Sequence, residues 1–357
     1  MLDRLYHAAK PLLFERDAEQ VHDRAIAALS RVSRHQTMLS TIDSHSDPRL
    51  AVRAFGFDIP HPLGIAAGLD KNGVAFPALA ALGFGHVEIG TVTPRPQEGN
   101  DRPRVFRLVE DRALINRLGF PGEGVGAVVS HAAQRKRDSM VVGCNIGPNK
   151  TAVETGRAIE DLVTCYRAVA SLSSWVTINV SSPNTTGLRD LQQKGTMRSM
   201  LAALNHERRT FHWRPLLIKI SPDLSLAELD DLIDVAVEME VDGLIATNST
   251  VSRPAGLISS HRSEAGGLSG APLAPLAEQS VRHIAARTQG ALPIIAAGGI
   301  ETGADVVHAL DAGAALCQTY TGFIYRGPAM PQLVASEILA ELDRRGVGSI
   351  DELLASR

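Results

Sequence analysis

The chain has 357 residues, of which 44% are hydrophobic and 21% charged, and its formal net charge at pH 7 is −3. This composition is typical of a globular protein with a sizeable core, and the lack of an extended basic block argues against nucleic acid as a partner. The three cysteines have neither CxxC nor metal-site spacing, which predicts a reducing compartment without disulfides. No apolar run approaches the roughly 20 residues of a membrane span, so we expect a soluble chain or one attached to a membrane surface.

The first 45 residues differ from the rest of the sequence. Two sets of apolar residues recur there at helical spacing: Leu5, Tyr6, Ala9, Leu12 and Leu13, then Val21, Ala25, Ile26, Ala28 and Leu29. They predict two short amphipathic helices. Periodicity alone favours an ordinary packing hairpin, and the alternative is an apolar lid or an anchor on a membrane surface.

From residue 46 onward, short apolar runs alternate with intervals of helix length. The eight runs are 63–67, 86–90, 141–146, 175–180, 216–220, 243–247, 293–297 and 315–320. Eight such repeats predict an α/β protein whose residues 46–357 form a (β/α)8 TIM barrel, with the two-helix extension before it. No GxGxxG motif follows an early strand, which argues against a dinucleotide-binding domain.

Two connections are longer than a barrel needs. Residues 94–120 contain an alternating pattern at 104–108, which predicts a small hairpin over the barrel mouth. Residues 249–272 are long enough to form a mobile lid.

The carboxyl ends of six predicted strands carry amide, hydroxyl or ammonium groups and almost no carboxylates. In chain order these residues are Lys71, Thr91, Asn145, Asn179, Ser182, Lys219, Thr247, Asn248 and Ser249. Active sites of parallel barrels lie at this end of the strands. Although the segment from Ser181 to Asn184 also fits an ordinary turn, the six ends together predict a pocket rich in donors for a ligand with carbonyl and anionic groups.

The last two strand ends are rich in glycine. Glycine lets backbone N–H groups approach an anion, and a helix predicted from Gly303 adds a favourable dipole. Tight turns explain each glycine singly but not their joint placement. We therefore expect a phosphate at Gly270, Gly299, Tyr320 and Thr321, as in other barrels of this class.

This set of groups needs a cofactor for redox chemistry. The histidines form no HxxxH or HxH pair beside carboxylates, and no Ser-His-Asp grouping falls on the strand ends. The phosphate cradle, two lysines and several amides suit flavin mononucleotide (FMN). Lys219 would place positive charge near the N1/O2 edge of the flavin.

Five motifs resemble the dihydroorotate dehydrogenases. They are AAGLDK at 66–71, EIGTVTP at 88–94, INRLGF at 115–120, NVSSPNT at 179–185 and GGLSG at 266–270. The resemblance covers essentially the whole chain, in order. The N-terminal extension, and a serine at 182 where other classes carry cysteine, resemble the class 2, quinone-dependent branch.

The resemblance implies oxidation of (S)-dihydroorotate to orotate in de novo pyrimidine biosynthesis, with hydride transfer to FMN and reoxidation by a membrane quinone. Ser182 would be the catalytic base that removes the C5 proton. Substrate would contact Lys71, Asn116, Arg117, Leu118, Gly119, Phe120, Asn179, Asn184, Asn248 and Ser249. FMN would contact Ala67, Gly68, Lys71, Thr91, Asn145, Asn179, Lys219, Thr247, Gly270, Gly299, Tyr320 and Thr321. Arg107 and Tyr320 would line a quinone tunnel.

With the resemblance, the extension (1–45) is better explained as the quinone entrance, which docks on the cytoplasmic face of the cell membrane, and a monomer is expected. Ser182 is a poor base when free, so it needs a closed, water-poor site, a water relay and withdrawal of charge into the flavin. Thr185 and Thr186 could supply hydroxyls nearby. Two residues depart from the family pattern: Ala18, where proline is commoner, and Pro121, where an amide is expected.

Three alternatives remain from sequence. Another FMN barrel reductase, such as a dihydropyrimidine or dihydrouridine reductase, would need a nicotinamide or iron–sulfur path or a basic RNA-binding face, and the chain carries neither cysteine clusters nor such a face. A flavin-free phosphate-binding lyase or isomerase would use the same barrel without a yellow cofactor. A non-catalytic sensor or scaffold would bind flavin or orotate without turnover.

Overall fold

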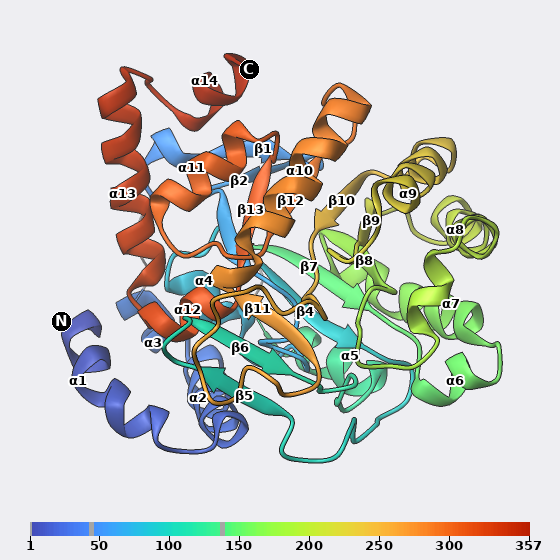
Figure 1. The fold of residues 1–357 in the computed structure, drawn as a ribbon, viewed down its shortest axis with the longest axis horizontal. Coiled ribbons are helices and arrows are strands. Elements are labelled where there is room, and N and C mark those ends of the chain that lie inside the picture. Colours follow the sequence, from blue (N-terminus) through green and yellow to red (C-terminus); the bar gives the residue numbers. More distant parts are fainter. Residues whose placement is uncertain (1, 43–45, 136–139) are drawn as a thin grey trace.

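The computed structural model describes residues 2–42, 46–135 and 140–357. At its centre is a closed barrel of eight parallel strands, around which the helices form an outer layer (Figure 1). The barrel strands are β3 (Leu63–Ile65), β4 (His86–Val92), β7 (Val141–Ile146), β8 (Trp175–Asn179), β9 (Leu216–Lys219), β10 (Gly243–Ala246), β12 (Ile294–Ala297) and β13 (Leu316–Thr319). They neighbour one another in this order, and β13 pairs with β3 to close the barrel. The predicted (β/α)8 barrel and all eight predicted strands are confirmed.

The barrel strands are buried along their whole length, which is why their sequences are near-continuous apolar runs. The outer helices are α4 (Phe76–Ala81), α5 (Val125–Ala133), α6 (Lys150–Glu154), α7 (Ala158–Val169), α8 (Lys194–Thr210), α9 (Leu226–Glu238), α10 (Ala274–Thr288), α11 (Gly303–Asp311), α12 (Thr321–Arg326), α13 (Met330–Arg345) and α14 (Ile350–Ala355). Short 3₁₀ helices occur at Pro48–Leu50, Ala170–Leu172, Leu188–Gln192 and Ala271–Leu273. One continuous apolar core joins the barrel to these helices.

The N-terminal extension contains the two predicted helices, α1 (Leu2–Phe14) and α2 (Ala18–Ser33), and a third, α3 (Gln36–Ile42), that periodicity did not predict. Helix α2 begins where the Asp17 carboxylate accepts a hydrogen bond from the backbone N–H of Gln20. It packs against α4 and against β5 of the mouth sheet described next. The predicted boundary between residues 45 and 46 falls at the edge of residues 43–45, which lie outside the described chain.

A small antiparallel sheet lies over the barrel mouth. The hairpin predicted within 94–120 is confirmed as β5 (Val105–Leu108) and β6 (Ala113–Asn116). The third strand, β11 (Gly267–Gly270), pairs with β6 and was missed, because 249–272 was predicted only as a long connection. Its sequence lacks β-branched residues, so only the pairing with β6 and the burial of Leu268 make it a strand.

A second unpredicted hairpin, β1 (Val52–Ala54) with β2 (Phe57–Ile59), precedes the barrel. Its strands have three residues each, too short for a clear alternating pattern. Val52 and Ile59 pair across it and are both buried in the main core, so the hairpin packs against the barrel.

Candidate active site

A cavity with an empty volume of about 1110 Å³ lies at the carboxyl ends of the barrel strands, and residues of the mouth sheet complete its wall. Most of the predicted site residues line it: Ala67, Gly68, Lys71, Thr91, Asn116, Leu118, Gly119, Phe120, Asn179, Ser182, Asn184, Lys219, Thr247, Asn248, Ser249, Gly270, Gly299, Tyr320 and Thr321. These residues lie up to 254 positions apart in the sequence, from 67 to 321. Barrel closure brings them together because all eight strands end at the same mouth.

Three predicted site residues, Arg107, Arg117 and Asn145, lie outside this wall. The Arg117 side chain points away from the cavity, where its Nη1 lies 2.8 Å from Glu264 and its guanidinium stacks on the Phe106 ring. Arg117 follows Asn116 along an extended segment, so the two side chains face opposite directions. Asn145 is fully buried behind Thr91.

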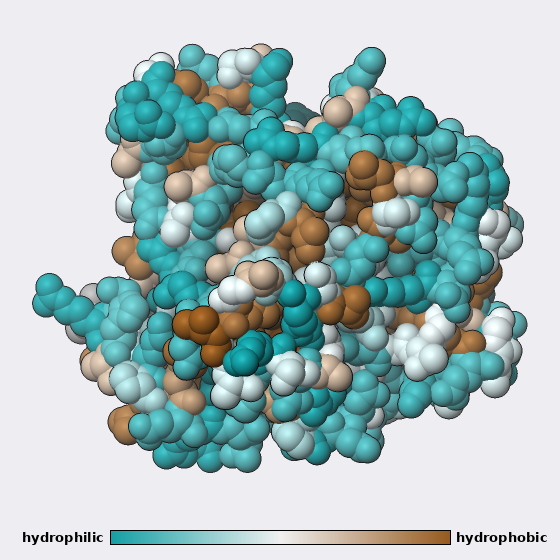
Figure 2. All heavy atoms as spheres, in the orientation of Figure 1, coloured by the Kyte–Doolittle hydropathy of each residue, from teal (hydrophilic) through white to brown (hydrophobic). Residues whose placement is uncertain are grey.

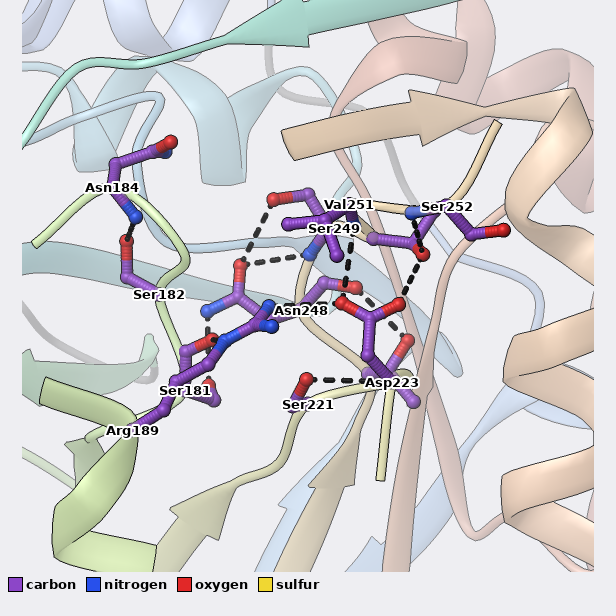
Figure 3. Close-up of polar contacts among 12 residues, drawn as sticks. Ser181, Ser182, Asn184, Arg189, Ser221, Asp223, Asn248, Ser249, Val251 and Ser252 are labelled. Atoms are coloured by element: carbon purple, nitrogen blue, oxygen red, sulfur yellow. Dashed lines mark hydrogen bonds and ion pairs between the residues drawn. The ribbon is translucent and has the colours of Figure 1, made fainter. Parts of the chain in front are cut away.

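Ser182 is buried in the first part of the loop that follows β8 (Figure 3). In the described part of the chain, its Oγ has one hydrogen bond, accepted from the backbone N–H of Asn184 at 3.3 Å. The Asn184 side chain in turn donates to Asn116 Oδ1 at 3.1 Å, which joins this loop to the mouth sheet. No hydrogen bond joins Ser182 to Thr185 or Thr186 among these residues. Burial of Ser182 and the hydrogen bond from the Asn184 backbone are the features of the structure that bear on its role as a base.

An ion pair that the sequence did not reveal holds the same loop in place. Arg189 donates to the Ser181 carbonyl at 3.1 Å and lies 3.0 Å from Asp223 (Figure 3). Asp223 also accepts hydrogen bonds from the Thr250 hydroxyl and from the Val251 backbone. The loops after β8, β9 and β10 are thereby connected through one carboxylate. The Arg and Asp are ordinary loop residues in sequence, which gave no signal of this pairing.

A chain of side-chain hydrogen bonds crosses the cavity floor with a single direction. Asn248 Nδ2 donates to Asn179 Oδ1 (3.2 Å), Asn179 Nδ2 donates to Thr91 Oγ1 (2.9 Å), and Thr91 donates to Asn145 Oδ1 (2.6 Å). Ser181 Oγ also donates to Asn179 Oδ1. We call Asn145, Thr91, Asn179 and Asn248 the amide chain. Each member orients the next, so the cavity presents fixed donors and acceptors.

Lys71 is half-buried beside the N-terminal extension. Its Nζ lies 3.1 Å from Nε2 of His22, a residue of α2 that the sequence analysis missed. Desolvation lowers the pKa of Lys71 to about 8, although the Asp23 carboxylate acts to raise it. The preceding Asp70 accepts hydrogen bonds from three backbone N–H groups at the start of α4, which fixes the backbone that carries Lys71. In the sequence, the only indication that His22 has a role was a histidine within an apolar helix pattern.

The glycine-rich wall allows close backbone approach. Gly270 and Gly299 have φ values of 97° and 74°, and a Cβ at either position would lie 2.4 Å from a neighbouring heavy atom. Any side chain there would be strained and would clash, so both positions require glycine.

The helix at Gly303 begins with its N–H groups already bonded within the protein. Thr302 and Asp305 form a capping box at the start of α11, in which the Asp305 carboxylate accepts from the backbone N–H of Thr302 at 2.7 Å. The N–H of Gly303 donates to Glu337 at 2.6 Å. Two carboxylates therefore already occupy this helix N-terminus, which disfavours a phosphate there. The glycine wall itself remains available.

A second, mostly apolar cavity, open to solvent, lies between helices α1 and α2 and the barrel. It shares Lys71, Leu118 and Tyr320 with the first cavity, so these three side chains form the wall between the two. Arg107 lies in this second cavity, where it donates to the carbonyls of Phe14 and Arg16 between the helices.

The outer surface of the extension is mixed in character. Figure 2 shows hydrophobic residues scattered among hydrophilic ones over α1 and α2, and Leu5 and Leu12 are 59% and 66% exposed. None of the described helices is long and apolar enough to cross a membrane. Nor do the described residues contain a cluster of His, Cys, Asp and Glu able to hold a metal ion.

Together, these features define a (β/α)8-barrel enzyme with a polar ligand site at the strand ends and an apolar chamber next to it. The family model for dihydroorotate dehydrogenase matches residues 49–342. The chain belongs to the dihydroorotate dehydrogenase family.

Relatives and solved structures agree over nearly the whole chain. Proteins named dihydroorotate dehydrogenase (quinone) are similar to it: one from Flavobacterium lutescens is 44% identical over 91% of this chain and 94% of its own. Another from Thermobifida fusca is 46% identical over 96% of this chain and 93% of its own. A crystal structure of DHODH from Eimeria tenella in complex with ferulenol superposes with a TM-score of 0.88 at 36% identity, covering 95% of both chains.

Proposed function

We propose that this chain oxidises (S)-dihydroorotate to orotate in pyrimidine biosynthesis and passes the electrons through FMN to a membrane quinone. The observation that carries the proposal is the pair of adjoining cavities, one polar and one apolar, with Tyr320 and Lys71 in the wall between them. Membership of the family, and relatives named for the quinone-dependent reaction, support it.

At the polar cavity, we assign the substrate to the side next to Ser182, Asn116 and Asn184. Dihydroorotate is an anionic amide, so carboxamide side chains match its ring and the Lys71 ammonium matches its carboxylate. Ser182 Oγ would accept the C5 proton as the hydride leaves C6, while its own hydroxyl proton passes to a relay water. Ser182 is only 6% exposed, so a bound substrate would leave little water around this proton transfer.

FMN fits the remaining part of this cavity on three grounds. The glycine wall at Gly270 and Gly299 has no room for a side chain and offers backbone to a phosphate. Lys219 is buried on the floor, where it suits an anionic ring. Gln318 lines the cavity with a buried Oε1 that has no hydrogen-bond partner among the described residues. When bound, FMN supplies an acceptor for the hydride and a donor of electrons to the quinone.

The apolar cavity is assigned to the quinone, and Arg107 and Tyr320 line it. Its walls come largely from α1 and α2, so the extension would form the entrance for a lipid-soluble molecule. We assign the chain to the cytoplasmic face of the cell membrane as a peripheral protein, and we expect a monomer.

The experiment that tests the proposal is an anaerobic absorbance titration of the purified chain. L-dihydroorotate should bleach a bound flavin spectrum, and a short-chain quinone should restore it. Restoration by fumarate or NAD⁺ but not by quinone would place the chain in another class of the family. A chain that binds no flavin after reconstitution with FMN would instead favour a phosphate-binding lyase or isomerase.

A further inference from the structure

Glu88 lies inside the barrel below the amide chain and was given no role by the sequence. It is on β4, it is 0% exposed, and its carboxylate accepts hydrogen bonds from four side chains of other barrel strands. Asn145 Nδ2 donates to Oε1 at 2.8 Å, while Gln318 (3.1 Å), Thr177 (3.2 Å) and Trp175 (3.4 Å) all donate to Oε2. A buried carboxylate is unfavourable unless it is compensated in this way.

The two carboxylate oxygens of Glu88 accept hydrogen bonds from different donors. Because a carboxylate only accepts, the Asn145 amide must turn its NH₂ group toward Oε1. Its Oδ1 then faces Thr91 and accepts the hydroxyl proton, so Thr91 in turn accepts from Asn179. The direction of the whole amide chain is therefore set at its buried end.

The same constraint acts on β13, which is separated from β4 by β3 alone. Gln318 commits its NH₂ group to Oε2 of Glu88, which turns its carbonyl oxygen away from this bond. That oxygen, in a residue lining the cavity, is buried and has no partner among the described residues. A buried acceptor without a donor is costly, so it indicates a donor supplied by a ligand.

We propose that Glu88 is a positioning residue for the cofactor pocket, which fixes the direction of the amide chain and the carbonyl of Gln318 toward the bound ligand. The inference rests on the proposed FMN site. Glu88 does not line the cavity; it acts through Asn145 and Gln318.

The decisive perturbation is Glu88→Gln, which keeps the shape of the side chain, replaces the acceptor Oε1 with an NH₂ group and removes a negative charge that acts on Lys219. The three donors at Oε2 retain the carbonyl oxygen of the new amide, so its NH₂ group faces the NH₂ group of Asn145. Asn145 must then turn over, and the Thr91 hydroxyl loses its acceptor. We expect the dissociation constant of FMN to rise about tenfold or more, the effect of one mispaired buried polar group.

The double variant Glu88→Gln/Asn145→Asp exchanges carboxylate and carboxamide between neighbours. The carboxylate introduced at position 145 accepts both from the amide at position 88 and from Thr91, so the original direction returns with the same net charge. We expect FMN affinity to return to within about threefold of the wild type. The matched control is Glu207→Gln, a buried carboxylate paired with Arg167 on the outer helices, which should leave FMN affinity unchanged.

The measurements are the FMN dissociation constant of the full-length chain by fluorescence titration and the visible circular dichroism of the FMN-loaded protein, with thermal melting alongside. Loss of FMN affinity in Glu88→Gln that the double variant restores supports the proposal. Wild-type affinity in Glu88→Gln, or a double variant that melts like the wild type yet binds FMN weakly, overturns it. If Glu88→Gln does not fold, the double variant decides alone: wild-type melting with wild-type FMN affinity supports the proposal, and wild-type melting with weak FMN binding overturns it. A wild-type chain that binds no FMN would instead refute the proposed function.

Discussion

The ion pair between Glu19 and Arg104 is a buried link between the N-terminal extension and the barrel mouth, and it gives the sharpest stability prediction. Their side chains are only 11% and 7% exposed. Arg104 donates to both carboxylate oxygens, at 2.7 and 3.1 Å, and its Nη1 donates to the carbonyls of Glu98 and Asn100. The pair therefore anchors α2 and the loop before β5 together.

Replacing Glu19 with Gln leaves a buried guanidinium without its counter-charge. Removing one partner of a buried pair costs about 3–5 kcal/mol, and the amide oxygen retains one of the hydrogen bonds, so we expect a loss of about 2–3 kcal/mol. Arg104→Met should cost a similar amount. The double variant should lose less than the sum of the two, with a coupling of about 2 kcal/mol.

Urea unfolding of the wild type, both single variants and the double variant measures these free energies. Glu238→Gln is the control, since Glu238 and Arg198 are paired at 49% and 42% exposure, where water screens the pair and its contribution to stability is small. Burial acts to raise the pKa of Glu19, but the hydrogen bond and charge of Arg104 outweigh this effect. The pKa of Glu19 therefore lies below its ordinary value. The stability that Glu19 contributes is thus fully present above the ordinary carboxyl pKa, and it is lost as the pH falls through the lower pKa that Glu19 has in the folded protein. Additive losses, or a loss no larger than that of the control, would refute this reasoning.

Three further predictions concern the proposed reaction. Ser182→Ala should keep FMN bound while slowing flavin reduction by dihydroorotate about 10²–10⁴-fold in stopped flow, as loss of a general base does; full activity would remove Ser182 from that role. Deletion of residues 1–40 should impair quinone turnover far more than flavin reduction, and equal loss of both would make the extension purely structural. Desolvation lowers the pKa of Lys71 to about 8, so the affinity of the FMN-loaded chain for orotate should weaken as the pH rises through that value. Lys71→Met should abolish this pH dependence. If the variant keeps the same pH profile, the dependence belongs to another group.

The barrel was predictable because each of its strands is an apolar run that ends at glycine or a polar residue. That abrupt change also marked the cavity residues, from Lys71 to Thr321. Strand β11 could not be found in the same way, since Gly267–Gly270 becomes a strand only through its partner β6. The pairing joins residues that are far apart in the sequence, so local strand propensity does not predict it.

Side-chain direction and buried pairing were the other limits. Arg117 was grouped with its neighbours by motif, although alternation after Asn116 turns it outward toward Glu264. The capping box of Thr302 and Asp305 has a readable spacing, and it could have excluded the start of α11 as a phosphate site. Glu88 gave no such signal, because a carboxylate inside an apolar strand is explained only by donors from other strands.

The shared wall of Lys71, Leu118 and Tyr320 constrains how the sequence can vary. A substitution at any of these three residues alters the surroundings of both cavities at once. Residues such as Ala25 and Leu29 line the apolar cavity alone, so they are free to change without disturbing the polar one. Variants that escape a compound bound in the apolar cavity should therefore accumulate on α2 and leave the wall intact. Compounds that draw their affinity from the wall itself would leave the fewest routes to such escape.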